Sequence, residues 1–394
     1  METRKTVNKY PTVFVHGYLG MGYEAGLTSV YRYFGSFTKD LMKHLSRQGY
    51  EVYQPTLGAF SPLWNRCCDL YAYLFGGTAD YGKVHSQRYH QKRYGRTYPG
   101  VLKDLGEEGD HKKLNLIGHS FGGPTVALFA GILEQGCKEE LEATPADEVS
   151  EFFKGGKGDL IHTVTTLSGV NAGTSAAAFA EEFHLMGLAS KLTAGLVSVI
   201  SETQLTKFLD FHMEAWGLME DPETVDTNRF KLPDMTAVNK YANNKEGNIY
   251  YEMHPVITRK LLADYKPNPH TYYFARRACR THAGPGGRQY PDTNMDPLFM
   301  PTALIMGKYK DESIGIDDSW LATDGIVNVM GMGAPDGHPS IEWIPGMDFK
   351  PGIWHEMPIE DKDHQSFAGM WYFRNSYYLY FDAMLRMLHT LPDA

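Results

Sequence analysis

The stretch Lys113-Leu114-Asn115-Leu116-Ile117-Gly118-His119-Ser120-Phe121-Gly122-Gly123 decides the fold of this 394-residue chain. An apolar run leads directly into Gly-x-Ser-x-Gly, and a helix-forming segment, residues 124–134, follows. A strand that turns this tightly into a helix holds its serine in a strained backbone conformation, and the flanking glycines avoid a Cβ clash. Ser120 is therefore predicted to project its hydroxyl from a sheet edge, ahead of a helix N-terminus that favours developing negative charge.

Strand, tight turn and helix around Gly-x-Ser-x-Gly form the nucleophile elbow of α/β-hydrolases. Further strand-like runs are 13–15, 50–53, 160–167, 302–306 and 326–329, and helices are expected near 35–48, 122–134 and 367–391. This alternation predicts an α/β-hydrolase fold with a mostly parallel central sheet and helices on both faces. Because no repeat or linker divides the chain, we expect one domain over residues 1–394, with insertions at about 61–99 and about 172–273.

The second insertion contains an apolar segment, Ala176–Ile200, that is expected to form one helix with a broad apolar face. Such a face suits a buried core helix, and it equally suits a mobile cover over an apolar pocket. The residues alone leave both interpretations open.

The segment His16-Gly17-Tyr18-Leu19-Gly20 follows the first strand, where this fold supplies one amide of the oxyanion hole. The second amide belongs to the residue after the nucleophile. We therefore predict that the Tyr18 and Phe121 N–H groups bind the oxyanion of the tetrahedral intermediate. His16 is expected to bond to nearby backbone and to shape the loop.

The general base and its orienting carboxylate should follow the serine in the order Asp, then His. Asp317 and Asp318 are typical of solvated or turn positions, whereas Asp324 precedes a glycine at the edge of an apolar run. The downstream histidines are His338, His355, His364 and His389. His364 lies in a polar loop before the terminal helix, so we predict a Ser120–His364–Asp324 triad.

Five further segments are Gly76-Gly77-Thr78-Ala79-Asp80-Tyr81-Gly82, Arg96-Thr97-Tyr98-Pro99-Gly100, Trp216-Gly217-Leu218, Gly315-Ile316-Asp317-Asp318 and Asp324-Gly325-Ile326-Val327-Asn328. With the elbow they resemble, in the same order, segments of the thermoalkalophilic bacterial lipases, so the chain looks like a divergent member of that family. The resemblance implies the same triad and the same oxyanion amides. It also implies that Ala176–Ile200 contains the family's lid helix.

The chain departs from this family at its metal sites. The family carries a zinc held by two Asp and two His, and the matching positions here are Asn65, His85, Gln91 and Asp226. Neutral amides bind zinc weakly, so His85 and Asp226 are left as doubtful ligands of a structural zinc. The acidic ligands of the family's calcium would fall near Ser366 and Trp371, which are not acidic, and no calcium is expected. The elbow also differs, because the family commonly has Ala-His-Ser-Gln-Gly.

Composition limits the partners of the chain. Lys and Arg total 38 against 47 Asp and Glu, a formal charge of −9, which favours neither nucleic acid nor an anionic membrane surface. No apolar run approaches the roughly 20 residues of a membrane-spanning helix, so a soluble protein is expected. Met1–Tyr10 has no signal-peptide core; the family resemblance implies secretion, and the compartment stays open. Cys67, Cys68, Cys137 and Cys279 are expected to be free, buried thiols.

These features predict a serine carboxylic-ester hydrolase, a lipase or esterase that cleaves acyl esters of glycerol or similar lipids through an acyl-enzyme. The apolar second insertion favours an acyl chain, with a lipid–water interface as a partner. A small-ester carboxylesterase, a phospholipase or a monoacylglycerol hydrolase stays open. So does a non-catalytic binding protein on the same fold, although such proteins usually lose a triad member. No cofactor is expected to be required for catalysis.

Overall fold

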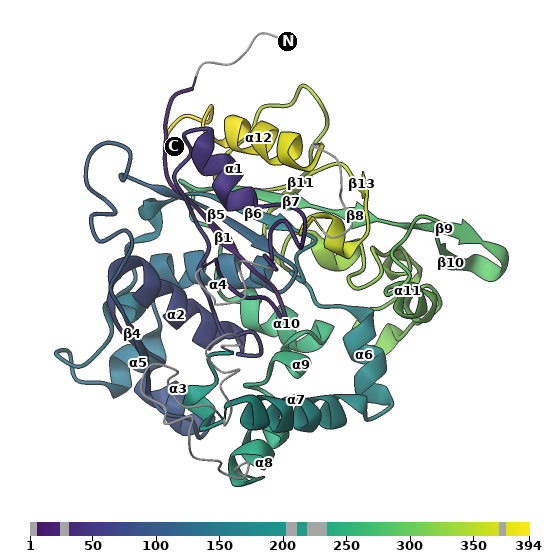
Figure 1. Cartoon of the computed structure of the whole chain (residues 1–394), viewed down its shortest axis with the longest axis horizontal. Coiled ribbons are helices and arrows are strands. Elements are labelled where there is room, and N and C mark those ends of the chain that lie inside the picture. Colours follow the sequence, from purple (N-terminus) through teal and green to yellow (C-terminus); the bar gives the residue numbers. More distant parts are fainter. Residues whose placement is uncertain (1–5, 24–30, 202–210, 219–234, 370–375) are drawn as a thin grey trace.

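A seven-stranded parallel sheet forms the centre of the computed structural model, which describes residues 6–23, 31–201, 211–218, 235–369 and 376–394 (Figure 1). The strand order is β11-β12-β7-β6-β5-β1-β2, and all neighbours pair in parallel. The bounds are β1 Thr12–Val15, β2 Val52–Tyr53, β5 Leu114–His119, β6 Ile161–Leu167, β7 Tyr272–Arg276, β11 Ser340–Glu342 and β12 Trp354–Glu356. The predicted α/β-hydrolase fold is confirmed.

Helices cover both faces of this sheet because its strands are apolar on both sides. In β1, Val13 and Val15 lie in the core shared with α2 and α4, whereas Phe14 lies in the core shared with α1 and α12. Alternate residues of a strand point to opposite faces, so one short apolar strand supplies both cores. Figure 1 shows α1 and α12 together on one side of the sheet, with α2 and α4 on the other.

Within the described residues the α-helices are α1 Leu41–Arg47, α2 Leu63–Phe75, α3 Lys83–Arg88, α4 Gly122–Gln135, α5 Lys138–Ala143, α6 Ser175–Glu182, α7 Leu185–Ser201, α8 Met235–Asn243, α9 Ile249–Glu252, α10 Pro255–Ala263, α11 Met300–Met306 and α12 Ser376–Leu388. The small two-stranded sheets pair β3 Gly77–Asp80 with β4 Tyr94–Tyr98, β9 Thr281–Gly284 with β10 Arg288–Pro291, and β8 Ala278–Cys279 with β13 Glu360–Asp361.

Two strand predictions are wrong. Residues 302–306 form the end of helix α11, because Pro301 suits the first turn of a helix and a five-residue apolar run does not distinguish helix from strand. Residues 326–329 form a turn closed by a single bridge between Thr323 and Asn328. The periodicity also missed β7 and β12, which are central strands, and it predicted α1 to begin earlier than Leu41.

The apolar segment 176–200 is not one helix. It forms α6 and α7, which are separated by a bend of 98°, and His184 in the break has a positive φ of 56°. Among the described residues no single helix has the length and apolarity to cross a membrane, and this bent pair meets the test only by length and composition.

All four cysteines are free thiols, as predicted, but only two are buried. Cys67 and Cys68 lie in the core between α2 and α4, whereas Cys137 and Cys279 are partly exposed. No local pattern predicts this difference in burial, because it depends on which helix covers each cysteine.

Candidate active site

Ser120 lies in the tight turn between β5 and α4, in a strained backbone conformation. Its φ is 57°, and its N–H donates to the Leu167 carbonyl of the neighbouring strand at 3.0 Å. The glycines on either side are required by close contacts: a Cβ at Gly118 would lie 2.1 Å from the Gly122 carbonyl oxygen, and one at Gly122 would lie 2.3 Å from that of Val15. The serine is therefore held at the carboxyl end of the central strand, as its sequence pattern predicts.

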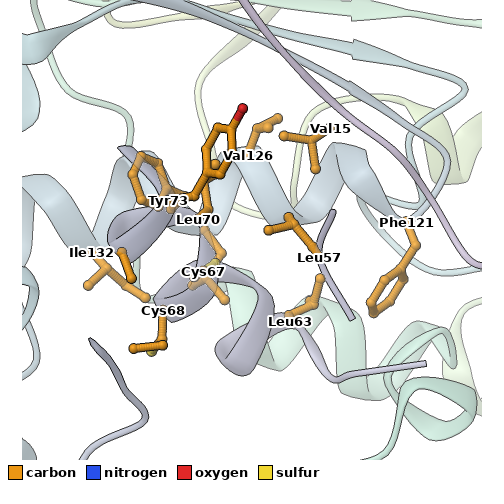
Figure 2. Packing of buried hydrophobic residues seen from close by; sticks show 14 of the residues in the cluster. Val15, Leu57, Leu63, Cys67, Cys68, Leu70, Tyr73, Phe121, Val126 and Ile132 are labelled. Carbon is orange, nitrogen blue, oxygen red and sulfur yellow. The ribbon is translucent and has the colours of Figure 1, made fainter. Parts of the chain in front are cut away.

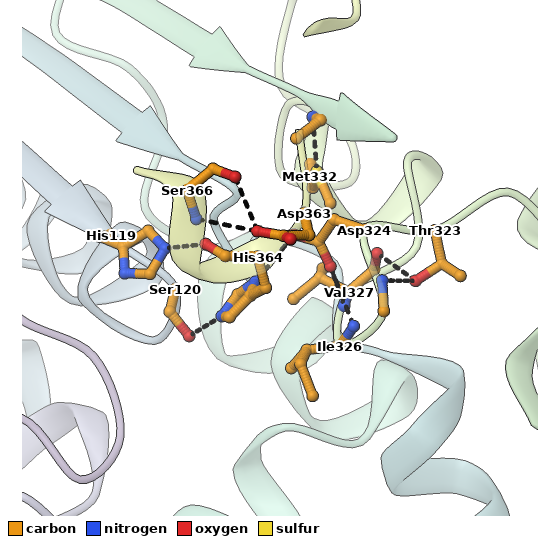
Figure 3. Close-up of polar contacts among 12 residues, drawn as sticks. His119, Ser120, Thr323, Asp324, Ile326, Val327, Met332, Asp363, His364 and Ser366 are labelled. Carbon is orange, nitrogen blue, oxygen red and sulfur yellow. Dashed lines mark hydrogen bonds and ion pairs between the residues drawn. The ribbon is translucent and has the colours of Figure 1, made fainter. Parts of the chain in front are cut away.

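His364 joins Ser120 to Asp324 through its two ring nitrogens (Figure 3). Nε2 lies 2.9 Å from Ser120 Oγ, and Nδ1 lies 2.7 Å from Asp324 Oδ2. A carboxylate only accepts, so Nδ1 carries the proton and Nε2 accepts from the serine hydroxyl. Asp324, His364 and Ser120 are 0%, 3% and 7% exposed, and this burial excludes water from the hydrogen bonds.

Asp324 is held in a loop rather than at a strand edge. Its second oxygen, Oδ1, accepts from the N–H groups of Ile326 at 2.9 Å and Val327 at 2.8 Å. The His364 N–H donates to the Asp324 carbonyl at 3.0 Å, so backbone and side chain both join the two residues. Two backbone donors fix the orientation of the carboxylate, which can then orient the imidazole.

His119, the second residue of the elbow, supports the position of His364. Its Nε2 donates to the His364 carbonyl at 2.9 Å, so its Nδ1 is the acceptor for the Tyr33 hydroxyl at 2.7 Å. Burial, with a smaller effect of the neighbouring His364, holds the pKa of His119 well below its usual range. A neutral ring is needed here, because an imidazolium could not accept from Tyr33.

The loop after β1 lies directly against the elbow. A Cβ at Gly17 would be 2.6 Å from the Ser120 Cβ, which explains why this position is glycine. Neither the Tyr18 N–H nor the Phe121 N–H donates to another described residue. Two backbone donors with no partner beside a buried serine hydroxyl form an arrangement suited to an oxyanion.

The alternative acids and bases lie elsewhere. Asp317 and Asp318 are exposed, and Asp317 caps a short 3₁₀ turn. His355 lies buried on β12 and bonds to the Tyr273 carbonyl. His338 bonds to the Leu262 carbonyl, and His389 directly follows α12.

Three of the residues that match the family's zinc ligands bond to one another. The Asn65 Nδ2 donates to Gln91 Oε1 at 2.9 Å, and Gln91 Nε2 donates back to Asn65 Oδ1 at 3.1 Å. His85 Nε2 lies 3.3 Å from the same Asn65 oxygen, so in this arrangement Nε2 carries the ring proton and donates to that oxygen. Asp226 lies outside the described residues, within which no cluster of His, Cys, Asp and Glu could hold a metal ion.

The position expected for the family's calcium is likewise not acidic. The Ser366 hydroxyl and N–H both bond to Asp363 Oδ1, at 2.7 and 3.1 Å, and the other Asp363 oxygen accepts from the Asp296 N–H. Trp371 lies outside the described residues. These local bonds shape the turn that contains His364.

Helix α7 presents an apolar row outward. Leu185, Leu188, Leu192, Leu196 and Val199 are between 46% and 66% exposed. On its inner face Ser190 Oγ donates to Asn248 Oδ1 at 3.3 Å. Thr193 bonds to the Tyr250 hydroxyl, which lies 2.7 Å from the Tyr18 hydroxyl. The helix is therefore linked through side chains to the loop beside Ser120.

Sequence reasoning missed two buried charged residues near this site. Arg66 is 0% exposed, and Glu252 is 3% exposed and accepts from the Leu63 N–H at 2.7 Å. Arg66 had a detectable signal, since it is a lone cation within the apolar helix sequence 63–75. Glu252 had none, because its contacts join segments about 190 residues apart.

The chain is similar to known lipases and esterases over most of its length. Residues 8–376 match the family described as "Lipase-like, C-terminal domain". Lipase 2 of Staphylococcus aureus is 30% identical over 368 residues, which cover 92% of this chain and 51% of that protein, so the chain spans about half of this curated relative.

Two solved structures are similar over nearly whole chains. EstA from Clostridium botulinum has a TM-score of 0.82 at 29% identity, with 100% of this chain and 90% of that chain covered. Lipase 1 from Pelosinus fermentans has a TM-score of 0.77 at 30% identity, with 98% and 100% covered. The resemblance to bacterial lipases drawn from the sequence motifs is confirmed.

Proposed function

The chain belongs to the lipase-like family described above, and on this premise we propose that it is a serine carboxylic-ester hydrolase that acts on acyl esters. The observation that carries the proposal is the bonded series Ser120–His364–Asp324, next to two backbone N–H groups that have no partner among the described residues. A binding protein on this fold would have no need to keep a strained serine, a neutral base and a buried carboxylate in contact.

The proposed reaction begins with proton transfer from Ser120 Oγ to His364 Nε2 as the oxygen attacks the ester carbonyl. Asp324 stabilises the imidazolium that forms and keeps its Nδ1 proton in place. The Tyr18 and Phe121 N–H groups bind the oxyanion of the tetrahedral intermediate. His364 then protonates the leaving alcohol, and water repeats the sequence on the acyl-enzyme. No step needs a metal or cofactor, and we propose that none takes part.

The proposed substrates are esters with an apolar acyl chain, presented at a lipid–water interface. The exposed leucines of α7 support this, because an apolar row of this kind favours contact with lipid when a partner surface is present. The link from Thr193 through Tyr250 to Tyr18 supports α7 as a cover whose position bears on the site. Two of the relatives are named lipases, which agrees with this substrate class.

The test is hydrolysis of p-nitrophenyl esters from acetate to palmitate by the wild type and by Ser120→Ala. Loss of the nucleophile of a triad should lower kcat on the order of 10⁶-fold. A wild type that hydrolyses no ester, or a variant that keeps its rate, would contradict the proposal. The profile across chain lengths then separates a lipase from a small-ester esterase.

Ser168→Ala is the matched control. Ser168 is buried at 0% exposure, has a positive φ of 45° and follows β6, the strand beside β5. It thus shares the burial and backbone strain of Ser120 without a contact to His364. We expect this variant to keep its activity, so a loss confined to Ser120→Ala is chemical and not structural.

A further inference from the structure

Arg66 is a fully buried cation whose guanidinium bonds to neutral acceptors from three different segments. Nε donates to Thr125 Oγ1 of α4 at 3.1 Å, Nη1 to the Gly58 carbonyl at 2.7 Å, and Nη2 to the His16 carbonyl. Within the described residues no carboxylate lies at ion-pair distance from it. A buried charge without a counter-ion costs free energy, which suggests that it serves a function.

The nearest acidic groups do not neutralise this charge through a direct bond. Glu252 Oε2 accepts from the Leu63 N–H instead. Burial raises the pKa of Glu252 to about 8, so this side chain is mostly protonated at neutral pH. Asp69 accepts from the Tyr81 hydroxyl at 2.9 Å, on the next turn of α2. The guanidinium is therefore held by neutral hydrogen-bond acceptors, and within the described residues no carboxylate bonds to it directly.

The His16 carbonyl that Arg66 binds belongs to the loop with the Tyr18 amide. His16 Nε2 accepts from the Leu57 N–H at 3.1 Å, so the ring proton is on Nδ1, which donates to the Gly17 carbonyl at 2.8 Å. That carbonyl and the Tyr18 N–H belong to one peptide unit. A hydrogen bond to the carbonyl of a peptide strengthens its N–H as a donor and fixes its direction.

Arg66 also lies close to the second oxyanion donor. Its guanidinium carbon is 5.8 Å from the centroid of the Phe121 ring, and its Thr125 partner bonds back to the Phe121 carbonyl at 2.8 Å. Figure 2 shows the packed layer between α2 and α4, with Leu63 and Phe121 on the side near the elbow. One buried side chain thus contacts both segments that supply the unpartnered N–H groups.

We propose that Arg66 is a positioning residue for the oxyanion hole. It holds the His16 carbonyl, and through it the Gly17–Tyr18 peptide, in the direction that binds the oxyanion. Its positive charge, in a site of low dielectric, favours the negative charge that develops there. The inference rests on the proposed function, because an oxyanion forms only if Ser120 attacks an ester.

The test compares Arg66→Met and Arg66→Lys on p-nitrophenyl butyrate. Loss of one oxyanion donor typically lowers kcat by about 10²–10³-fold, and we expect a loss of this order for Arg66→Met, with little change in KM. Arg66→Lys keeps the positive charge but cannot form all three guanidinium hydrogen bonds, so we expect an intermediate loss of kcat. Inhibition by an alkylboronic acid, which forms a tetrahedral anion on Ser120, should weaken in parallel with kcat.

Arg93→Met is the matched control, because Arg93 lies in the same insertion and forms a structural ion pair with Asp80 at 3.0 Å. We expect it to affect thermal stability but neither kcat nor boronate affinity. The proposal is overturned if folded Arg66 variants keep the wild-type kcat, or if kcat falls without weaker boronate inhibition. Should Arg66→Met not fold, Arg66→Lys decides on the same readouts. An inactive wild type instead refutes the proposed function.

Discussion

Hydrogen bonds fix the orientation and the tautomer of the histidines around Ser120, because the chemistry of each partner determines which atom donates. A carbonyl or carboxylate only accepts, so the protonated nitrogens of His16, His119 and His364 follow from their partners. Two of these rings are positioning groups, and both must stay neutral to accept at their second nitrogen. Burial holds the pKa of both His16 and His119 well below the usual range, which keeps the two rings neutral.

Glu252 gives a prediction about stability and pH. Burial raises its pKa from 4.5 to about 8, so as the pH rises from 4.5 to about 8 the unfolded chain loses this proton before the folded chain does. The folded state then binds more protons, and stability falls over this window. Glu252→Gln keeps an acceptor for the Leu63 N–H and has no proton to lose, so the difference in Tm, variant minus wild type, should grow from pH 5 to pH 8.

The measurement is differential scanning calorimetry of both proteins at steps of pH. The exposed Glu246→Gln serves as the control, since it removes one carboxyl without a buried contact. Parallel Tm curves for wild type and Glu252→Gln would refute the raised pKa.

At the scale of elements, helix α7 has apolar residues on its exposed face as well as on its buried face. Met186, Ala194 and Val197 are buried, yet the row from Leu185 to Val199 is exposed. The inner face adds hydroxyl contacts through Ser190 and Thr193. We propose that this helix is the mobile cover of the site, because an element that exposes an apolar row gains by moving onto an apolar surface.

Thr193→Val tests this role of α7. The change removes the bond to Tyr250 at nearly constant volume, so a closed position of the helix should lose about 1 kcal/mol, equivalent to about a 5-fold shift toward the open form. We expect kcat/KM on a dissolved short-chain ester to rise by up to that factor, with activity on an emulsion nearly unchanged.

Tyr250→Phe, which breaks both bonds of the hydroxyl series, should act in the same direction. Lys191→Gln is the control, because Lys191 is exposed on the same helix. The expectation fails if Thr193→Val and Tyr250→Phe have the same ratio of activity on the dissolved ester to activity on the emulsion as the control Lys191→Gln. The hydroxyl series would then not hold α7 in place.

At the scale of the whole molecule, apolar packing connects the first insertion to one of the two cores beside the sheet. Helix α2 of that insertion lies in one core, and Asn65 and Gln91 bond to each other. We therefore predict that EDTA leaves the Tm and the esterase activity unchanged. A fall in Tm that zinc alone restores would contradict this prediction.

The double variant Asn65→Asp with Gln91→His is the informative counterpart. The variant places a carboxylate and an imidazole, both common zinc ligands, beside His85. It also removes the amide pair whose Asn65 oxygen now faces the His85 ring. A metal that binds the folded state raises stability according to its concentration and affinity. We expect a zinc-dependent increase in Tm for this variant and none for the wild type.

The sequence by itself determined the elbow, the parallel α/β sheet and the order of Ser120, Asp324 and His364. These depend on local spacing: a strand, two glycines and a helix within about a dozen residues leave few conformations for the serine. The choice of Asp324 and His364 followed in part from local context, because Asp317 and Asp318 lie in a segment typical of turns, whereas the buried strand position of His355 was not evident from the sequence.

Only the tertiary structure decided the rest. Residues 302–306 are a helix, β7 and β12 are central strands, and the segment 176–200 bends, because short apolar runs take the conformation that their neighbours allow. The partners of Arg66, the protonation of Glu252 and the link from Thr193 to Tyr18 join residues far apart in the chain. Burial and long-range hydrogen bonding arise from packing, which no local pattern encodes.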